Sequence, residues 1–474
     1  MSAPAYNPVT AEIAAELRRI VGDRHVVMDA ESLAAYSHDE SKGLAVPGPA
    51  EVVVKPRTAQ EVAEIVRLAN RRLIPVTPRG AGSGLSGGAV PARGGILLSC
   101  ERMNSIIEID AENLMIVVEP GVVTNEINER LKERGLFYAG YPMSTETCFI
   151  GGNIAENAGG GRAVKYGVTE RYVLGVQVVT PTGEIAEFGG KLVKNATGYN
   201  LVKLFAGSEG TLGIVTRATL KLLPLPKASV ALLALFPDTA SAIGAVPKIM
   251  TEGGVIPTAI EFMDQASARA ACQYLNETLP WEDAGAMLLI EIDGSHEDTV
   301  VREYETVGEM CLKHGASEVF VADNATTRQR VWNVRKNIPE AFNLLTNIQS
   351  GEDIVVPPAQ IPRMLEAFAR VAERHGMVIP CFGHAGDGNL HARVMKGPQD
   401  TEAAWRAKLP GALKELYREA KALGGSISGE HGIGLKRKKY IGLALSETEL
   451  DFMRRIKQAV DPNNIMNPGK IFEM

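Results

Sequence analysis

Between residues 50 and 225 the chain alternates short apolar runs with amphipathic stretches. A helix is predicted to begin after Thr58, where the capping-box pattern Thr58–Glu61 precedes a 3.6-residue apolar repeat that continues to about Arg72. A second helix is predicted from about Asn125 to Gly135, because glycine suits the left-handed position after a helix. Runs with strand character are Glu51–Lys55, Ile74–Thr77, Gly95–Ser99, Ile106–Ile109, Leu114–Val118, Leu174–Thr180 and Glu184–Phe188. The pattern predicts an α+β region.

The pattern changes at a proline-containing linker, Leu223–Ser229. Later strand candidates are Val230–Phe236, Ala286–Asp293, Glu318–Ala322 and Ile354–Val356, and amphipathic helical stretches such as Thr299–His314 and Ile361–His375 lie between most of them. We predict a separate βαβ-like domain of about 200 residues here. The last 50 residues return to glycine-rich loops and include a helix opened by the capping box Ser446–Glu449. The predicted domains are therefore 1–226, 227–425 and 426–474.

Charge and cysteine content exclude several classes of protein. The chain has 474 residues and a net charge of −6, which argues against a nucleic-acid binder. Its five cysteines form no C-x-x-C pair, so we expect free thiols rather than a disulfide framework, a zinc ribbon or an iron–sulfur cluster. The N-terminal residues lack the pattern of a signal peptide, and no apolar run approaches a membrane span. We expect a cytoplasmic protein that can lie at the inner face of the membrane through a partner.

Seven of the 48 glycines lie in a seventeen-residue loop from Arg79 to Gly95, which reads RGAGSGLSGGAVPARGG. The loop follows a predicted strand, so its backbone N–H groups can approach a phosphate closely. It contains no G-K-[ST], which excludes a Walker A loop. The spacing Gly82-Gly84-Gly87 matches G-x-G-x-x-G, but a Rossmann site needs a helix directly afterwards, and Ala89-Val90-Pro91 follow instead. We therefore predict a different kind of pyrophosphate cradle.

Two further loops of small residues lie within the same region. They are Ile150–Gly161, which reads IGGNIAENAGGG, and Leu204–Val215, which reads LFAGSEGTLGIV. One such loop alone is typical of a structural turn. Three together predict one elongated ligand held along its length by backbone contacts, and FAD fits that description.

Histidine and carboxylate side chains cluster in two glycine-flanked motifs. The first is HAGDGNLH from His384 to His391, and Asp387-Gly388 at its centre is a hairpin-turn signal. Seven residues apart, the two histidines would lie on opposite faces of a straight strand, whereas a hairpin can bring them together. The second, Gly429–Gly432, adds Glu430 and His431. Two histidines and a carboxylate suit a divalent metal, with zinc, manganese and iron all compatible. The alternative is that these histidines only satisfy hydrogen bonds in the core.

Taken together, these motifs resemble those of a known flavoprotein class. PRGAGSGLSGG, GGN-A-NAGG and F-GSEGTLGIVT are similar to the FAD-binding domain of the vanillyl-alcohol oxidase/p-cresol methylhydroxylase class. With the two histidine motifs, the resemblance narrows to FAD-linked D-lactate dehydrogenases and the flavin subunit of glycolate oxidase, and it extends from about Tyr36 to the NPGKIF tail. It implies an α+β fold with a two-part FAD-binding domain (1–226), a substrate or cap domain (227–425) and a C-terminal segment that closes the active site (426–474).

The resemblance also implies which residues hold FAD. Residues 79–95 contain no histidine, so we expect the FAD to be non-covalent. The residues expected to contact its pyrophosphate, its flavin and ribityl parts, or its adenosine are Gly80, Gly82, Ser83, Gly84, Leu85, Ser86, Pro142, Thr147, Gly151, Gly152, Asn153, Ala155, Gly159, Glu209, Gly210, Gly213 and Ile214.

By the same resemblance, a divalent metal would be bound by His384, His391 and Glu430, and His431 would be the catalytic base. Asn389 is expected to orient the substrate or the metal. Arg335 is expected to anchor the substrate carboxylate, the alternative being a surface ion pair on a helix.

The expected reaction is oxidation of a small D-2-hydroxy acid to the 2-oxo acid by hydride transfer to flavin N5. The resemblance implies that relatives acting on 2-hydroxyglutarate use extra polar and basic groups in the stretch after Lys336. Because no basic residue lies between Lys336 and Asp353 here, D-lactate is favoured and glycolate comes next.

The electron acceptor is expected to be a separate partner, because neither a nicotinamide fingerprint nor cluster cysteines are present. An iron–sulfur subunit, an electron-transferring flavoprotein and a quinone-linked chain all remain open, as does a homodimer. Two alternative functions stay in view. A metal-independent flavin oxidase of an alcohol or aldonolactone conflicts with the GDGN and GEHG motifs. A non-catalytic electron-relay subunit would not need the complete histidine and glutamate set.

Overall fold

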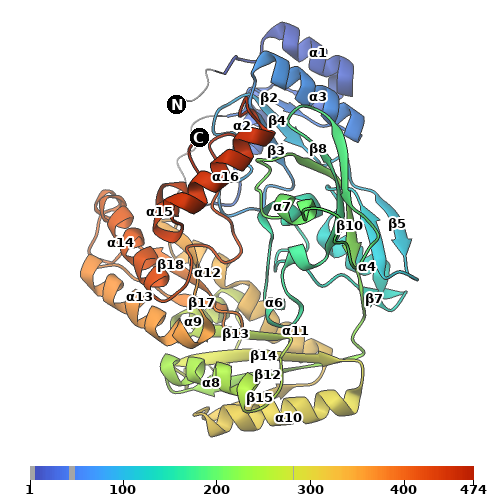
Figure 1. Ribbon diagram of the computed structural model, residues 1–474. Coiled ribbons are helices and arrows are strands. Elements are labelled where there is room, and N and C mark those ends of the chain that lie inside the picture. Colours follow the sequence, from blue (N-terminus) through green and yellow to red (C-terminus); the bar gives the residue numbers. More distant parts are fainter. Residues whose placement is uncertain (1–5, 42–48, 281) are drawn as a thin grey trace. The chain divides into compact units, whose positions relative to one another are not determined.

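The computed structural model describes residues 6–41, 49–280 and 282–474, and they form two compact units (Figure 1). Unit 1 is drawn from Met1–Gly159, Val168–Pro224 and Glu430–Met474, and unit 2 from Gly160–Gly167 and Leu225–Gly429. Residues 1–5 and 42–48 of the first predicted domain, and residue 281 of the second, lie outside the described residues. Most of the expected C-terminal segment thus groups with the N-terminal region, whereas 160–167 group with unit 2.

Unit 1 begins with a four-stranded sheet in the order β1-β2-β4-β3. Its strands are β1 (Val26–Val27), β2 (Val52–Val54), β3 (Val76–Arg79) and β4 (Ile96–Ser99). Strand β4 pairs in parallel with both β2 and β3, and α3 (Ala59–Arg72) crosses between β2 and β3. The apolar face of α3 is buried in the core, as its periodicity predicted. The Thr58 hydroxyl accepts from Glu61 N–H, but the Glu61 carboxylate accepts from Arg57 N–H, so only half of the predicted capping box forms.

A second sheet of unit 1 is antiparallel and has the order β5-β6-β10-β8-β9. The strands are β5 (Ile106–Asp110), β6 (Met115–Val118), β8 (Val173–Val179), β9 (Ile185–Gly189) and β10 (Ile214–Lys221), and β7 (Leu136–Phe137) pairs separately with β11 (Leu223–Pro224). The predicted hairpin of β8 and β9 is confirmed. The remaining helices of unit 1 are α1 (Ala11–Val21), α2 (Ala30–Tyr36), α4 (Thr124–Lys132), α5 (Ile150–Glu156), α7 (Leu201–Phe205), α15 (Ile441–Ala444) and α16 (Glu447–Val460). The complete capping box at Ser446 is also confirmed.

Unit 2 is built on one seven-stranded sheet in the order β15-β12-β14-β13-β17-β18-β16. The strands are β12 (Ala228–Phe236), β13 (Ala259–Asp264), β14 (Ala286–Gly294), β15 (Glu318–Ala322), β16 (Gln349–Val355), β17 (Cys381–His384) and β18 (Asn389–Met395). Every ladder is antiparallel, which corrects the βαβ-like expectation. The crossover through α8 (Thr239–Thr251) does connect two strands of the same direction, β12 and β13, but β14 lies between them and pairs with both.

Helices cover the sheet of unit 2 (Figure 1). Helices α8 and α10 (Glu297–Lys313) contact β12 and β14. Apolar side chains of α9 (Gln265–Leu275), α11 (Ala325–Lys336) and α12 (Ile338–Leu345) form a core cluster with Leu233, Met263, Leu289 and Phe382. Helices α13 (Ile361–His375) and α14 (Glu402–Ala422) contact each other, and α6 (Ala163–Tyr166) lies beside β13. The expected α+β fold is therefore present, with the histidine motif on strands β17 and β18.

All five cysteines are buried and free, as predicted. Among the described residues, no helix is both long and apolar enough to cross a membrane.

Candidate active site and metal centre

The hairpin of β17 and β18 brings the two histidines of the first motif together, as the Asp387-Gly388 signal predicted. Gly388 has a φ of +89°, a conformation that glycine adopts without strain. Phe382 pairs with His391 and His384 with Asn389, so the histidines are diagonal neighbours on one face of the sheet. Their Nε2 atoms are 3.4 Å apart, and their rings are perpendicular.

This separation suits two ligands of one metal ion. Two imidazole nitrogens about 2.0–2.1 Å from a tetrahedral zinc lie roughly 3.4 Å apart. The His384 Nδ1 atom is occupied by a protein partner, so its Nε2 faces His391 with a lone pair available. The donor chemistry and spacing therefore fit a divalent metal.

The side chain that orients His384 is Glu261, on β13 directly opposite it in the register. The Glu261 carboxylate oxygens lie 2.7 and 2.9 Å from His384 Nδ1, and Glu261 Oε2 lies 2.6 Å from Arg335 Nη2. Burial raises the pKa of Glu261, but the Arg335 guanidinium and His384 outweigh it and hold that pKa below its usual value. Because an ionised carboxylate only accepts hydrogen bonds, Nδ1 of His384 must be the donor. No motif in the sequence marks Glu261, and its role was not predicted.

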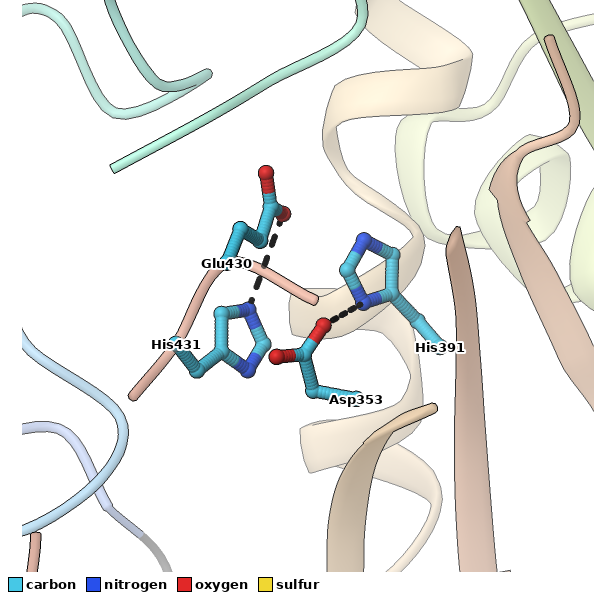
Figure 2. Close-up of side chains that lie close together, drawn as sticks. All are labelled: Asp353, His391, Glu430 and His431. Atoms are coloured by element: carbon cyan, nitrogen blue, oxygen red, sulfur yellow. Dashed lines mark ion pairs between the residues drawn. The ribbon is translucent and has the colours of Figure 1, made fainter. Parts of the chain in front are cut away.

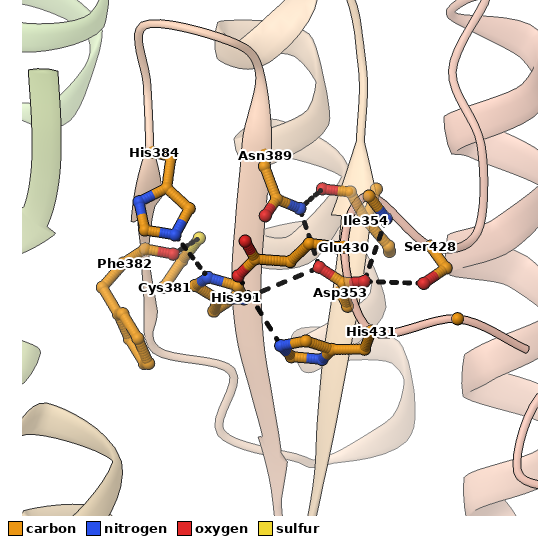
Figure 3. Close-up of polar contacts among 12 residues, drawn as sticks. Asp353, Ile354, Cys381, Phe382, His384, Asn389, His391, Ser428, Glu430 and His431 are labelled. Carbon is orange, nitrogen blue, oxygen red and sulfur yellow. Dashed lines mark hydrogen bonds and ion pairs between the residues drawn. The ribbon is translucent and has the colours of Figure 1, made fainter. Parts of the chain in front are cut away.

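Asp353 organises the other side of the site (Figure 3). It is fully buried on β16 opposite His391, and its Oδ1 lies 3.8 Å from His391 Nδ1. Its carboxylate accepts hydrogen bonds from Asn389 Nδ2 at 2.8 Å, Ser428 Oγ at 2.7 Å and Gly429 N–H at 2.9 Å. Asp353 thereby fixes the chain immediately before Glu430. The sequence reading missed this residue as well.

Four side chains form a group able to hold a metal ion: Asp353, His391, Glu430 and His431 (Figure 2). Each offers one ligand atom, and these atoms lie within 4.8 Å of one another. His384 stands outside this group but adjoins it through His391. Three of the four predicted metal and base residues are thus gathered here, and Asp353 is an addition.

The turn that carries His431 is held by Glu209, on the third glycine loop. The Glu209 carboxylate accepts hydrogen bonds from Ile433 N–H at 2.7 Å and Gly434 N–H at 2.8 Å. A Cβ atom at Gly432 would overlap the carboxylate of Glu156. Burial raises the pKa of Glu156 strongly, with Glu209 and Asp39 adding to it, whereas the two backbone N–H groups moderate the burial-driven rise in the pKa of Glu209. The Glu209 side chain is therefore engaged within the protein.

The three glycine loops of unit 1 lie close to one another or to strand β3. A Cβ atom at Gly80 would lie 3.4 Å from Gly152 N, so the first two loops adjoin. A Cβ atom at Gly210 would lie 2.6 Å from Pro78, which places the third loop against β3. Gly82 has a φ of +79°, and a side chain there would collide with the Arg79 guanidinium. Such a cradle, which a Cβ atom would fill, fits a cofactor held by backbone groups.

The predicted FAD residues separate into two sets by exposure. The first set is half-buried: Gly80, Gly82, Ser83, Gly84, Leu85, Pro142, Gly151, Gly152 and Ala155. The second set is buried and supports the loops: Ser86, Asn153, Gly159, Glu209, Gly210, Gly213 and Ile214. Asn153 Nδ2, for example, donates to Thr124 Oγ1 at 2.7 Å. Thr147 is exposed, and its hydroxyl donates to Ser144 O at 3.3 Å.

The two residues predicted to contact the substrate, Arg335 and Asn389, each have a protein partner. Arg335 is only 3% exposed and its Nη2 lies 2.6 Å from Glu261 Oε2, so it does not form the alternative surface ion pair. Asn389 donates to Asp353 Oδ1 and, at 3.3 Å, to Ile354 O. A Cβ atom at Gly429 would overlap the Asn389 amide, so a glycine is required there. Buried Arg335 Nε and Nη2 and Asn389 Oδ1 have no hydrogen-bond partner in the described part of the chain, so the substrate roles of both residues stay predictions.

Comparisons with known proteins agree with this architecture. The family model for the C-terminal domain of FAD-linked oxidases matches residues 225–471, and an FAD binding domain model matches residues 50–189. The chain is 38% identical to the glycolate oxidase subunit GlcD of Bacillus subtilis (strain 168), over 98% of this chain and 97% of that protein. It is 37% identical to a D-lactate dehydrogenase of Anaerostipes hadrus, over 99% of both chains.

A D-2-hydroxyglutarate dehydrogenase of Stutzerimonas stutzeri (strain A1501) is 34% identical over 96% of this chain and 98% of its own. Among solved structures, p-cresol methylhydroxylase with substrate bound superposes with a TM-score of 0.80, at 18% identity and 99% coverage of both chains. That likeness shows the shared fold, as expected from the glycine loops. With two matching domain models and full-length relatives, the chain belongs to the family of FAD-linked oxidases.

Proposed function

We propose that this protein is an FAD- and divalent-metal-dependent dehydrogenase that oxidises a small D-2-hydroxy acid, D-lactate first and glycolate second, to the 2-oxo acid. The observation that carries the proposal is the pair of facing imidazoles, His384 and His391, with Glu261 behind the first. Relatives named for glycolate, D-lactate and D-2-hydroxyglutarate support the substrate class.

The proposed metal ligands are His384, His391 and Glu430, and Asp353 offers a further carboxylate beside His391 and Glu430. Glu261 fixes the tautomer and ring orientation of His384, and this kind of support increases the basicity of a ligand. Asn389 and Ser428 hold Asp353 in place. Zinc, manganese and iron all accept these nitrogen and oxygen donors.

The proposed base is His431. Side chains pack closely against Gly429 and Gly432 on either side of Glu430 and His431, and Glu209 fixes the residues that follow His431. A neutral imidazole can take the proton of the substrate hydroxyl at a ring nitrogen, since its pKa lies near physiological pH in an ordinary environment. The loop backbone around Gly80, Gly82 and Gly152 would hold FAD without a covalent bond. When bound, FAD accepts two electrons from the substrate and the metal polarises the hydroxyl oxygen.

Electrons are proposed to leave through a partner protein or a quinone-linked chain. The relative named as a subunit of glycolate oxidase favours a partner subunit, either an iron–sulfur protein or an electron-transferring flavoprotein. A cytoplasmic protein that lies at the membrane through this partner fits the proposal.

Stopped-flow reduction of the flavin tests the proposal. Metal-replete protein is mixed without oxygen with D-lactate, L-lactate, glycolate or D-2-hydroxyglutarate, and loss of the oxidised flavin absorbance is followed. We expect D-lactate to reduce the flavin fastest. His431→Ala should keep the bound FAD but reduce it roughly 10²–10⁴-fold more slowly, because the positioned base is lost. His314→Ala, which removes a surface histidine paired with Glu252, is the control. Unimpaired reduction in His431→Ala would end the assignment of the base.

A further inference from the structure

The C-terminal tail, residues 461–474, lies beside the strand that leads into the first glycine loop of unit 1. Val76 N–H, on β3, donates to Ile465 O at 2.8 Å, and Asn467 N–H donates to Val76 O at 2.8 Å. Val76 and Met466 thereby form a parallel bridge, and β3 is an edge strand of its sheet. The tail therefore extends this sheet next to the start of the loop.

Asn467 joins two of the glycine loops through one side chain. Its Nδ2 donates to Gly88 O of the first loop at 3.0 Å and to Glu209 O of the third loop at 2.7 Å. Asn467 is only 1% exposed, so water does not compete for these two hydrogen bonds. Its φ of +44° is a left-handed conformation, which asparagine adopts more readily than most residues. Both N–H groups of the amide are therefore used to hold the two loops together.

Lys470 sets the orientation of this amide. Its Nζ donates to Asn467 Oδ1 at 3.0 Å and to Val90 O, also in the first loop, at 2.5 Å. An ammonium offers only hydrogen-bond donors, so the Asn467 atom that faces it is the amide oxygen, and the amide N–H groups face the two loop carbonyls. Lys470 is 3% exposed, which places the whole arrangement in the interior of unit 1.

The charge of Lys470 is also attracted by carboxyl groups from all three loops. Burial lowers the pKa of Lys470 to about 7, and Lys438 adds to that decrease, whereas Glu209, Asp39 and Glu156 act in the opposite direction. Glu209 lies on the third loop and Glu156 on the second. Asp39 accepts a hydrogen bond from the N–H group of the residue before Gly88, at 2.8 Å, and is thereby attached to the first loop. The tail thus supplies one buried positive charge to acidic groups on every loop.

We propose that Asn467 and Lys470 are positioning residues for FAD, which fix the spacing of the first and third glycine loops so that the loop backbone is already arranged to bind the cofactor. This inference rests on the proposed FAD cradle and is independent of the substrate and of the metal. Loops that became ordered only on binding would lose conformational entropy at that step and would bind FAD more weakly.

The test compares Asn467→Asp and Lys470→Met with the wild type. Asn467→Asp keeps the size of the side chain and an oxygen for Lys470, but it replaces the N–H groups that face the loop carbonyls. Lys470→Met keeps most of the volume and removes the charge. FAD is removed from each holoenzyme, and its rebinding is measured by isothermal titration calorimetry. We expect the Kd for FAD to rise about 10- to 100-fold in both variants, because buried loop carbonyls lose their donors.

Hydrogen exchange of the apoproteins, followed by mass spectrometry, separates loop positioning from general stability. We expect faster exchange in the first and third loops of both variants and unchanged exchange in the other elements of unit 1. Tyr6→Phe is the matched control. The Tyr6 hydroxyl donates to Asn464 O at 2.6 Å, so this variant loses a hydrogen bond to the same tail while the bonds to the loops remain. Its Kd for FAD should equal that of the wild type.

An unchanged Kd for FAD in both tail variants would overturn the inference, and either variant alone decides the question if the other does not fold. A rise in Kd for Tyr6→Phe that equals the rise for Asn467→Asp, or faster exchange throughout unit 1, would overturn it as well, since both results indicate a general loss of stability. If the Kd rises as expected but no 2-hydroxy acid reduces the wild-type flavin, the proposed function fails while the role of Asn467 and Lys470 stands.

Discussion

The glycine loops of unit 1 and the strand-borne cluster of unit 2 hold their expected ligands in opposite ways. The loops present half-buried backbone at Gly80, Gly82 and Gly152. The cluster places side chains on adjacent strands, where register sets their spacing and fully buried carboxylates fix their orientation. Backbone groups suit a long cofactor with many weak contacts. Side chains on a sheet suit a metal ion, whose ligands must be placed to within a few tenths of an ångström. We therefore expect a substitution in one region to abolish binding of its own ligand and to leave binding of the other ligand unchanged.

The largest effect is expected from His391→Ala. Loss of a ligand from a site with few ligands should abolish stoichiometric metal binding, while the FAD cradle in unit 1 remains intact. Metal analysis should show less than about a tenth of an ion per FAD, and flavin reduction by D-lactate should fall by at least about 10³-fold. His375→Ala, which removes a histidine paired with Glu415, is the matched control. Loss of FAD together with the metal would show that the two regions are not independent.

Gly82→Val is expected to have the opposite effect, which is loss of FAD while the metal stays bound. A β-branched side chain is strained at a φ of +79° and would displace the Arg79 guanidinium from the loop. FAD content, measured from the absorbance of released flavin, should fall at least tenfold, and metal content should stay near the wild-type value. Gly244→Ala is the control: Gly244 lies within α8 with no atom within 4 Å of an added Cβ. A Gly82→Val protein that keeps its FAD would show that the loop around Gly82 does not hold FAD.

Sequence alone predicted the parts of this comparison whose signals are local. The Asp387-Gly388 turn, the glycine loops and the capping box at Ser446 each lie within a few residues, and each was read correctly as structure. The role of Glu261 was not predicted, because its partner His384 is 123 residues away and its strand, AIEFMD, carries no motif. The role of Asp353 was not predicted for the same reason: its hydrogen-bond partner Asn389 is 36 residues away in the sequence, and only strand register brings the two together. The βαβ expectation failed because no local pattern reveals that β14 inserts between β12 and β13.

An intermediate effect is expected from Glu261→Gln. The amide cannot neutralise Arg335, so a buried charge loses its counter-ion, which should lower the free energy of unfolding by about 3–5 kcal/mol. Loss of the carboxylate behind His384 should also weaken metal binding by about 10- to 100-fold. Urea unfolding and competition with a chelator measure the two effects. Glu252→Gln, at a surface ion pair, should change neither quantity. Metal affinity equal to the wild type in Glu261→Gln would contradict the role of Glu261.

The smallest effect is a pH dependence in unit 1. Burial beside Glu209 and Asp39 raises the folded-state pKa of Glu156, so Glu156 stabilises the fold below its unfolded pKa of about 4.3 and that stability is lost as the pH rises. Glu156→Gln removes this titration. The free energy of unfolding of the variant, relative to the wild type, should increase as the pH rises above the unfolded pKa of about 4.3. Urea midpoints at four pH values provide the measurement, and a pH-independent difference would exclude a raised pKa.

The most direct test of the central claim is an anaerobic titration with D-lactate before and after chelation of the metal. We expect the chelated protein to keep its full complement of FAD, to lose bleaching of the flavin by D-lactate, and to regain this bleaching on addition of zinc, manganese or iron. Bleaching at an unchanged rate in protein shown to be free of metal would contradict the account.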